Sequence, residues 1–198
     1  MKKLLALATV LVGFSAQPVL AESQTYKFDK QHTEVIFSYR HLGLSRAYAT
    51  FDKVDGELKI DRNAPEKSKV NVVIDVKSID TGVDIFDKHI QGADFFHTAK
   101  YPKATFVSTK VQKSSGGSFK VTGNLTIKGK TKPVSLNLKL NADKEHPMAA
   151  FNPKMKGVYV VAFSGKTTIK RSDFGMGLYV PATSDEVDII IETEMLRK

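Results

Sequence analysis

Residues 118–140 read SFKVTGNLTIKGKTKPVSLNLKL, and this stretch decides the fold class. Apolar residues occupy every second position over 119–127 and again over 134–140, with Lys, Thr, Ser and Asn between them. A period of two is typical of β-strands that have one buried and one solvated face. Gly129 lies between the two runs, and a glycine in so short a connection indicates a hairpin. The stretch therefore predicts two neighbouring antiparallel strands.

The same alternation recurs along the rest of the chain. Further strand-like runs lie near residues 33–41, 46–60, 70–76, 103–112, 158–170, 174–180 and 187–191. Together these runs predict about eight or more strands in one all-β domain. An antiparallel sheet of that size forms either a closed barrel or a sandwich.

Residues 82–97 interrupt the alternation. Val83, Phe86 and Ile90 have the spacing of a short amphipathic helix, and a turn follows before Pro102. We therefore expect a short helical insert here that plugs or covers one end of a barrel.

A second irregular stretch, residues 142–157, carries Met148, Phe151 and Met155 among its prolines. An apolar loop of this length is either a flap packed on the body of the domain or a mobile gate.

The interior of such a barrel has two possible states. Eight strands enclose a space that is either filled by side chains or just wide enough for one small ligand. A filled interior is the default interpretation. Gly123 and the many valines at inward positions favour a hollow instead.

The N-terminus has the three parts of a secretory signal peptide. Two lysines precede an apolar run over residues 4–14, and small residues end at Ala21. The apolar run is shorter than the about 20 residues that a membrane-spanning helix requires. We expect a cleaved signal over residues 1–21, a single domain over residues 22–198 and a periplasmic location. An uncleaved N-terminal anchor is the alternative.

Composition and charge exclude several classes of function. The chain has no Cys, so disulfides, thiolate metal sites and cysteine nucleophiles are absent. Without the signal it has 28 basic and 21 acidic residues. Its lysines are scattered at outward strand positions such as Lys120, Lys128 and Lys139, which indicates a solvated face rather than a nucleic-acid groove. We expect no nucleic-acid partner, although a basic surface also suits anionic lipid head groups.

The sequence contains no convincing catalytic motif. Residues 165–167 (GKT) resemble the end of a phosphate-binding loop, but Val160 stands where its first glycine is required. The five histidines show no metal-ligand spacing, and Asp84 with Asp87 suits the first turn of a helix. We therefore predict that the protein is not an enzyme and has no catalytic residue, no metal site and no cofactor.

A series of motifs, kept in order along the chain, carries a family resemblance. They are residues 78–82 (SIDTG), 87–90 (DKHI), 94–96 (DFF), 122–129 (TGNLTIKG) and 171–175 (RSDFG). Asp29, His32, Phe37 and His41 agree with them near the N-terminus. Together these motifs resemble the YceI-like family of periplasmic lipid-binding proteins.

The resemblance implies a lipocalin-like, extended antiparallel barrel whose lumen holds a polyisoprenoid chain. The ligand would be an isoprenoid quinone or a polyprenyl pyrophosphate, held for transport or storage, and family members often form homodimers. We expect the following side chains to contact the lipid in the lumen: Phe37, Tyr39, Phe51, Ile74, Phe86, Ile90, Phe106, Leu125, Leu136, Phe163 and Phe174.

A lipid head group needs hydrogen-bond donors at one mouth of the barrel. We expect these donors to be Arg40, His41, Arg46, Lys88 and His89, because His41 continues an inward strand face and the others lie near it or on the helical insert. Arg40 and Arg46 have exposed surface charges as their alternative interpretation.

Arg171 and Asp173 fit a different role, which is to tie loops together.

A different class of function fits the same strand pattern. A domain with a solid core would be a structural or stress-related periplasmic protein that acts through its surface. Its basic face or residues 142–157 would contact a protein partner or, transiently, a membrane. An isoprenoid-modifying enzyme is a third possibility, and it requires a base or metal that the sequence does not display.

Overall fold

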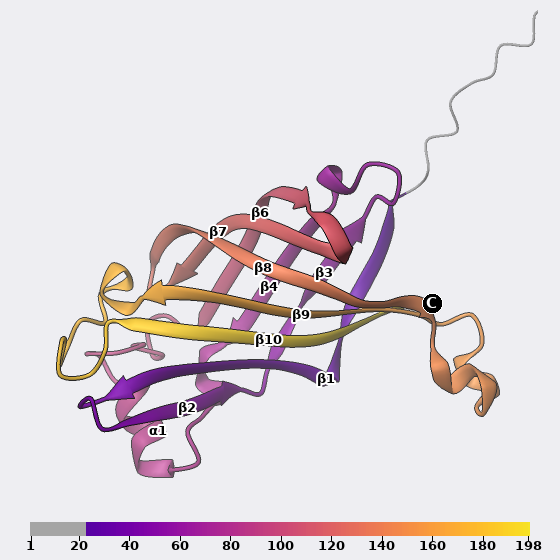
Figure 1. Ribbon diagram of the computed structural model, residues 1–198. Coiled ribbons are helices and arrows are strands. Elements are labelled where there is room, and N and C mark those ends of the chain that lie inside the picture. Colours follow the sequence, from indigo (N-terminus) through magenta and orange to yellow (C-terminus); the bar gives the residue numbers. More distant parts are fainter. Residues whose placement is uncertain (1–22) are drawn as a thin grey trace, which may run out of the picture.

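Ten antiparallel strands form one sheet in the computed structural model, which describes residues 23–198 (Figure 1). The expected signal over residues 1–21 lies outside the described residues. The helix α1 (Asp84–Ile90) lies between β5 and β6. None of the helices in residues 23–198 has the length and hydropathy needed to cross a bilayer. The strands are β1 (Gln24–His41), β2 (Ser45–Phe51), β3 (Val54–Ile60), β4 (Lys69–Asp75), β5 (Ile79–Asp80), β6 (Lys103–Lys113), β7 (Ser118–Ile127), β8 (Lys130–Glu145), β9 (Tyr159–Lys170) and β10 (Glu186–Arg197).

The sheet closes into a barrel because β1 pairs with β10. Eight of the strands in residues 23–198 make the ring, in the order β10-β9-β8-β7-β6-β4-β3-β1. β1 pairs with β3 through residues 24–27 and with β2 through residues 36–41, so β2 and β5 extend the wall at one end. The predicted antiparallel barrel is confirmed, and the sandwich alternative is wrong.

The two ends of the barrel are built differently (Figure 1). One end carries the turn between β1 and β2, the helix α1 and residues 171–185, and we call it the α1 end. The other end carries residues 61–68 and the connection between β8 and β9, residues 146–158, and we call it the hairpin end. Figure 1 shows this connection, in orange, projecting beyond the wall of the barrel.

Two sequence predictions need correction. The run over residues 46–60 is broken at Asp52 and Lys53, where the chain bends from β2 into β3. The strand predicted near residues 174–180 is absent, because the chain there forms a 3-10 helix (Arg171–Phe174) and turns. The helical insert is confirmed as α1 followed by turns up to residue 100.

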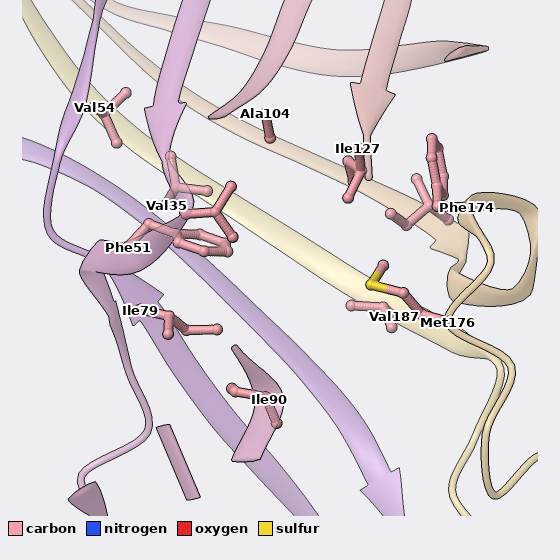
Figure 2. Packing of buried hydrophobic residues seen from close by; sticks show 12 residues of the cluster. Val35, Phe51, Val54, Ile79, Ile90, Ala104, Ile127, Phe174, Met176 and Val187 are labelled. Atoms are coloured by element: carbon pink, nitrogen blue, oxygen red, sulfur yellow. The ribbon is translucent and has the colours of Figure 1, made fainter. Parts of the chain in front are cut away.

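The largest buried apolar cluster lies toward the α1 end (Figure 2). Its members come from opposite parts of the wall and include Val35 of β1, Ala104 of β6, Ile127 of β7 and Val187 of β10. Burial of such side chains stabilises each by about 1.5–3 kcal/mol relative to exposure. This cluster holds together the half of the barrel that carries the helical insert.

Candidate functional site

The barrel encloses an apolar cavity of about 760 Å³. Side chains from all eight barrel strands and from α1 line this cavity, which extends from the α1 end to the hairpin end. Its volume falls within the range of about 300–1,000 Å³ that is typical of small-molecule sites. The structure thus has a hollow interior, and the default expectation of a barrel filled by its own side chains is wrong.

Burial along the strands supports the same conclusion. Phe37, Leu125 and Leu136 face the lumen and remain only half-buried, because the cavity itself is accessible to solvent. The adjacent residues in the sequence, such as Asn124 and Asn137, point to the outer face and are exposed. The period of two in the sequence therefore separates lumen from solvent rather than core from solvent.

The glycines at inward strand positions do not create the hollow interior. A Cβ atom on Gly123 would lie 2.5 Å from Cζ of Phe106 and 2.6 Å from the carbonyl oxygen of Val107. A Cβ atom on Gly165 would lie 2.5 Å from a methyl carbon of Leu138. Neighbouring side chains therefore occupy the space above both glycines, and the lumen is left open elsewhere.

The structure places ten of the eleven expected lipid-contacting side chains in the cavity lining. Phe174 is the exception, since it is 1% exposed and packs in the apolar cluster outside the lining. It is the last residue of the 3-10 helix Arg171–Phe174 and not part of a strand, so the alternation rule does not apply to it. The ten are Phe37, Tyr39, Phe51, Ile74, Phe86, Ile90, Phe106, Leu125, Leu136 and Phe163.

Aromatic rings of the helical insert line the lumen at the α1 end. The ring of Phe96 lies 6.5 Å from Phe37 and 5.8 Å from Phe51, measured between centroids. His89 lies 5.1 Å from Phe95, whose ring is in turn 6.4 Å from Tyr179. The insert thus forms part of the cavity lining at this end of the barrel.

Only part of the expected head-group set reaches the cavity. His41 and His89 belong to the lining, whereas Arg40, Arg46 and Lys88 do not. Strand alternation puts Arg40 on the outer face of β1, and Arg46 is its register partner on β2.

An ion pair holds Arg46 on the outer face. Its Nη1 donates to Oδ2 of Asp188 at 2.6 Å and to Oγ of Ser38 at 3.0 Å. The interpretation of Arg40 and Arg46 as charges on the outer surface therefore agrees with the geometry.

Arg171 is a lining residue at the α1 end that the sequence did not assign to the site. It is 7% exposed, and within residues 23–198 its side chain donates only to backbone carbonyls. Nε donates to Ser184 at 2.8 Å, Nη1 to Leu178 at 2.8 Å and to Met176, and Nη2 to Thr183 at 3.0 Å. Arg171 thus ties this loop together, as expected, but through carbonyl groups.

The charge of Arg171 is not neutralised by direct contact with a carboxylate. Burial lowers its pKa, and the nearby charge of Asp185 opposes that shift. Oδ1 and Oδ2 of Asp185 accept hydrogen bonds from the backbone N–H and the hydroxyl of Ser172. Burial raises the pKa of Tyr39, and the charge of Arg171 opposes that shift. The α1 end therefore holds a fixed positive charge beside the lumen.

An ion pair crosses the barrel at the hairpin end. Arg62 follows β3 and Asp143 belongs to β8, and these two strands lie on opposite sides of the ring. Nη2 of Arg62 donates to Oδ1 of Asp143 at 2.8 Å and to the hydroxyl of Tyr26 at 2.8 Å, and Nη1 donates to Oδ2 of Asp143. Both charged residues line the cavity. No sequence signal predicted this pair, because the two residues are 81 positions apart.

A third polar cluster lies at a bulge in β1, between Phe28 and Thr33. Ligand atoms of Asp29, His32 and Glu194 lie within 4.8 Å of one another. His32 Nδ1 and Asp29 Oδ2 are 2.9 Å apart. This hydrogen bond raises the pKa of His32. Burial acts to raise the pKa of Asp29, but the hydrogen bond with His32 holds that pKa below its ordinary value. The cluster fastens the bulge and lies outside the cavity lining.

Known proteins share this sequence and architecture. The YceI-like domain family matches residues 26–195. Protein YceI of Escherichia coli is 42% identical over 195 residues, which cover 98% of this chain and 96% of that protein. The crystal structure of Burkholderia cenocepacia BcnA is similar with a TM-score of 0.73 and 26% identity, covering 86% of this chain and 99% of BcnA.

A more distant structure shares the fold alone. It is a polyisoprenoid binding domain from Saccharophagus degradans, with a TM-score of 0.60 and 17% identity over 87% of this chain and 98% of that one. The family match spans most of the described residues, so the resemblance carried by the sequence motifs is confirmed: this chain belongs to the YceI-like family.

Proposed function

We propose that this protein binds one isoprenoid lipid in the barrel lumen and carries or stores it in the periplasm. The observation that carries the proposal is the apolar cavity of about 760 Å³, lined from every strand of the barrel. Transfer of a methylene group from water into such a lining contributes about 0.8 kcal/mol. A five-carbon isoprene unit therefore contributes about 4 kcal/mol before the entropy of ordering the tail is subtracted.

The head group of the proposed ligand lies at the α1 end, beside His41, His89 and Arg171. A guanidinium has five N–H donors, and four hydrogen bonds from Arg171 already go to backbone carbonyls. A quinone carbonyl needs about one such donor, whereas a pyrophosphate needs several together with cations. Because Arg40, Arg46 and Lys88 lie outside the lining, the α1 end suits a quinone head group better than a pyrophosphate. Lys69 and Lys113 line the cavity at the hairpin end, so a pyrophosphate would find its cations there instead.

Two further considerations support the proposal. The polyisoprenoid binding domain from Saccharophagus degradans has the same fold. The sequence of residues 1–21 predicts export, which would bring the protein next to bilayers that contain isoprenoid lipids. In this proposal the lipid is a ligand rather than a cofactor, the protein is not an enzyme, and nucleic acid is not a partner. A homodimer stays a prediction of the family resemblance.

One observation favours a second candidate function. Phe151 is 82% exposed and Met148 is 48% exposed on the connection between β8 and β9. Lys154 and Lys156 lie on the same connection. Such a basic, apolar tip suits a contact with a protein partner or a membrane, which is the surface-acting role considered for a solid domain.

Native mass spectrometry of the protein purified from its own periplasm tests the proposal. We expect an adduct that organic solvent extracts as an isoprenoid quinone. An adduct with the mass of a prenyl pyrophosphate would keep the carrier role and correct the head group. A protein that is lipid-free as purified, and stays so after incubation with ubiquinone and with farnesyl pyrophosphate, would contradict lipid binding and favour the surface role.

A further inference from the structure

We propose that the α1 end is a docking surface for a lipid bilayer. The surface consists of the apolar rim Leu42, Leu44, Val83, Ile85 and Tyr179, of which Tyr179 also lines the cavity. This inference rests on the proposed function, because a protein that takes an isoprenoid lipid from a bilayer must bring its lumen to that bilayer.

The five rim side chains are apolar, yet each of them is more than half exposed. Leu44 is 83% exposed, Ile85 78%, Tyr179 57%, Val83 53% and Leu42 52%. Single exposed apolar side chains are common on soluble proteins, but several at one end of a domain indicate a surface that is covered by a partner.

Three separate segments supply the rim, and the fold brings them to the same end. The β1–β2 turn is joined to residues 171–185, because the backbone N–H of Arg40 donates to Oγ of Ser184 at 2.9 Å and the backbone N–H of Ser184 donates to the carbonyl of Arg40 at 3.0 Å. β2 pairs with β5, which leads directly into α1. The turns after α1 reach the third segment where Phe95 lies 6.4 Å from Tyr179.

The rim is continuous with the cavity. Tyr179 belongs both to the rim and to the cavity lining, and so does its neighbour Leu178, which is 39% exposed. An apolar tail that leaves the lumen at this end meets apolar side chains up to the outer surface. The other four rim residues lie outside the lining, as do Met148 and Phe151 at the hairpin end, where the exposed apolar tip has no lining residue of its own.

Charge at the α1 end is mixed and contributes little to bilayer binding. Arg40 and Lys88 are exposed there, and neither takes part in the ion pairs of the described chain. A cation near an anionic membrane surface raises affinity by about fivefold. Asp80, Asp84, Asp94 and Asp173 are exposed at the same end and offset this attraction. Insertion of the apolar rim therefore contributes more than charge, and binding depends only weakly on salt.

Flotation of the mature chain with vesicles of phosphatidylethanolamine and phosphatidylglycerol tests this proposal. We expect the wild-type protein to float, and the double variant Leu44→Asp with Ile85→Asp to bind about tenfold or more weakly. The matched control is Met148→Asp with Phe151→Asp, which adds the same charge at the hairpin end and should bind like the wild type. Both pairs are exposed, and circular dichroism checks the fold. Leu44→Ser with Ile85→Ser removes the apolar rim without added charge and should bind weakly as well.

Three results would overturn docking at the α1 end. They are a wild-type protein that does not float, rim variants that bind like the wild type, and a hairpin-end variant that loses binding instead. Rim variants that convert a dimer into a monomer while vesicle binding persists would assign the rim to a second copy of the chain, which also contradicts the proposal.

A second readout separates this inference from the proposed function. The rim variants should still take up ubiquinone from detergent micelles, as detected by mass spectrometry, but should extract it slowly from vesicles. A wild-type protein that floats and never takes up an isoprenoid would refute the proposed function and leave docking intact. A protein that holds the lipid without binding vesicles would refute docking and leave the proposed function intact.

Discussion

A carboxylate in the middle of the lumen should abolish lipid binding in a way that acid reverses. Leu125 lies on β7, is the register partner of Phe106 and faces the cavity. In the lipid-free Leu125→Asp protein the new carboxylate is hydrated by water in the lumen. A lipid tail would displace that water, so the lipid-bound state must bury the carboxyl group in its neutral form.

The magnitude follows from two contributions. Protonating an aspartate whose ordinary pKa is about 3.9 costs about 4 kcal/mol at pH 7. Burying the neutral carboxyl group without a partner adds about 1–3 kcal/mol. The sum of about 5 kcal/mol or more corresponds to an affinity lower by more than three orders of magnitude. Because the lipid raises the pKa of this group, binding improves as the pH falls, by about a hundredfold between pH 7 and pH 5.

Titration of the lipid-free protein with ubiquinone at several pH values measures this effect. Leu125→Asn is the matched control, since it carries no titratable group and should lose about 1–3 kcal/mol of binding free energy at every pH. Asn124→Asp places the same charge on the exposed outer face of the neighbouring position and should bind like the wild type. A folded Leu125→Asp protein with wild-type affinity at pH 7 would refute the assignment of the lumen as the lipid site.

Three further predictions concern the stability of the barrel, each measured by urea unfolding. Alanine substitutions of Arg62 and Asp143, combined in a double-mutant cycle, should give a coupling free energy of about 1–2 kcal/mol, and simple additivity would show that the ion pair across the hairpin end contributes nothing. The bond to Asp29 raises the pKa of His32 above its ordinary 6.5. The contribution of this bond to the free energy of unfolding is therefore fully present below pH 6.5 and is lost as the pH rises through the raised pKa. His32→Gln should remove this part of the pH dependence, and a variant that still loses the same stability on the alkaline side would contradict the assignment. Gly123→Ala should destabilise the barrel by about 1–3 kcal/mol, because the new Cβ would lie 2.6 Å from a backbone carbonyl oxygen, and an unchanged midpoint would show that β7 shifts freely.

Alternation along strands made most of the lumen predictable from the sequence. Residues two positions apart in a strand point to the same face, so Phe37 and Leu136 are expected to face inward with their apolar neighbours at that spacing. This rule requires no knowledge of which strands pair. The rule applies only within strands. The prediction for Phe174 is wrong because residues 171–174 form a 3-10 helix instead of a strand. Hydrogen bonds from Arg171 to carbonyl groups of residues 176–184 hold the following loop, and such bonds leave no periodic pattern in the sequence.

The head-group donors were harder to predict for a related reason. Nearness in sequence suggested that Arg40 and Arg46 would accompany His41, but successive strand residues point to opposite faces, so both arginines lie outside the lumen. The pair Arg62 and Asp143 depends on which strands stand opposite each other once the barrel has closed. Closure brings together residues that are distant in sequence, and neither composition nor spacing encodes such a contact.

The difference between the two ends determines how the proposed lipid lies in the barrel. At the hairpin end, Arg62 and Asp143 satisfy each other, and the buried side chains of Tyr26 and Val161 pack beside them. A neutral head group there would compete with an existing ion pair, whereas the end of an isoprenoid tail needs no polar partner. Lys69 and Lys113 also line this end, so only an anionic head group would find cations there. At the α1 end, the partners of the Arg171 side chain in the described part of the chain are carbonyl groups, so a head group that accepts a hydrogen bond gains stabilisation without displacing a carboxylate. The proposed lipid therefore inserts tail first through the α1 end, and its head group stays at the mouth that the apolar rim would bring to the bilayer.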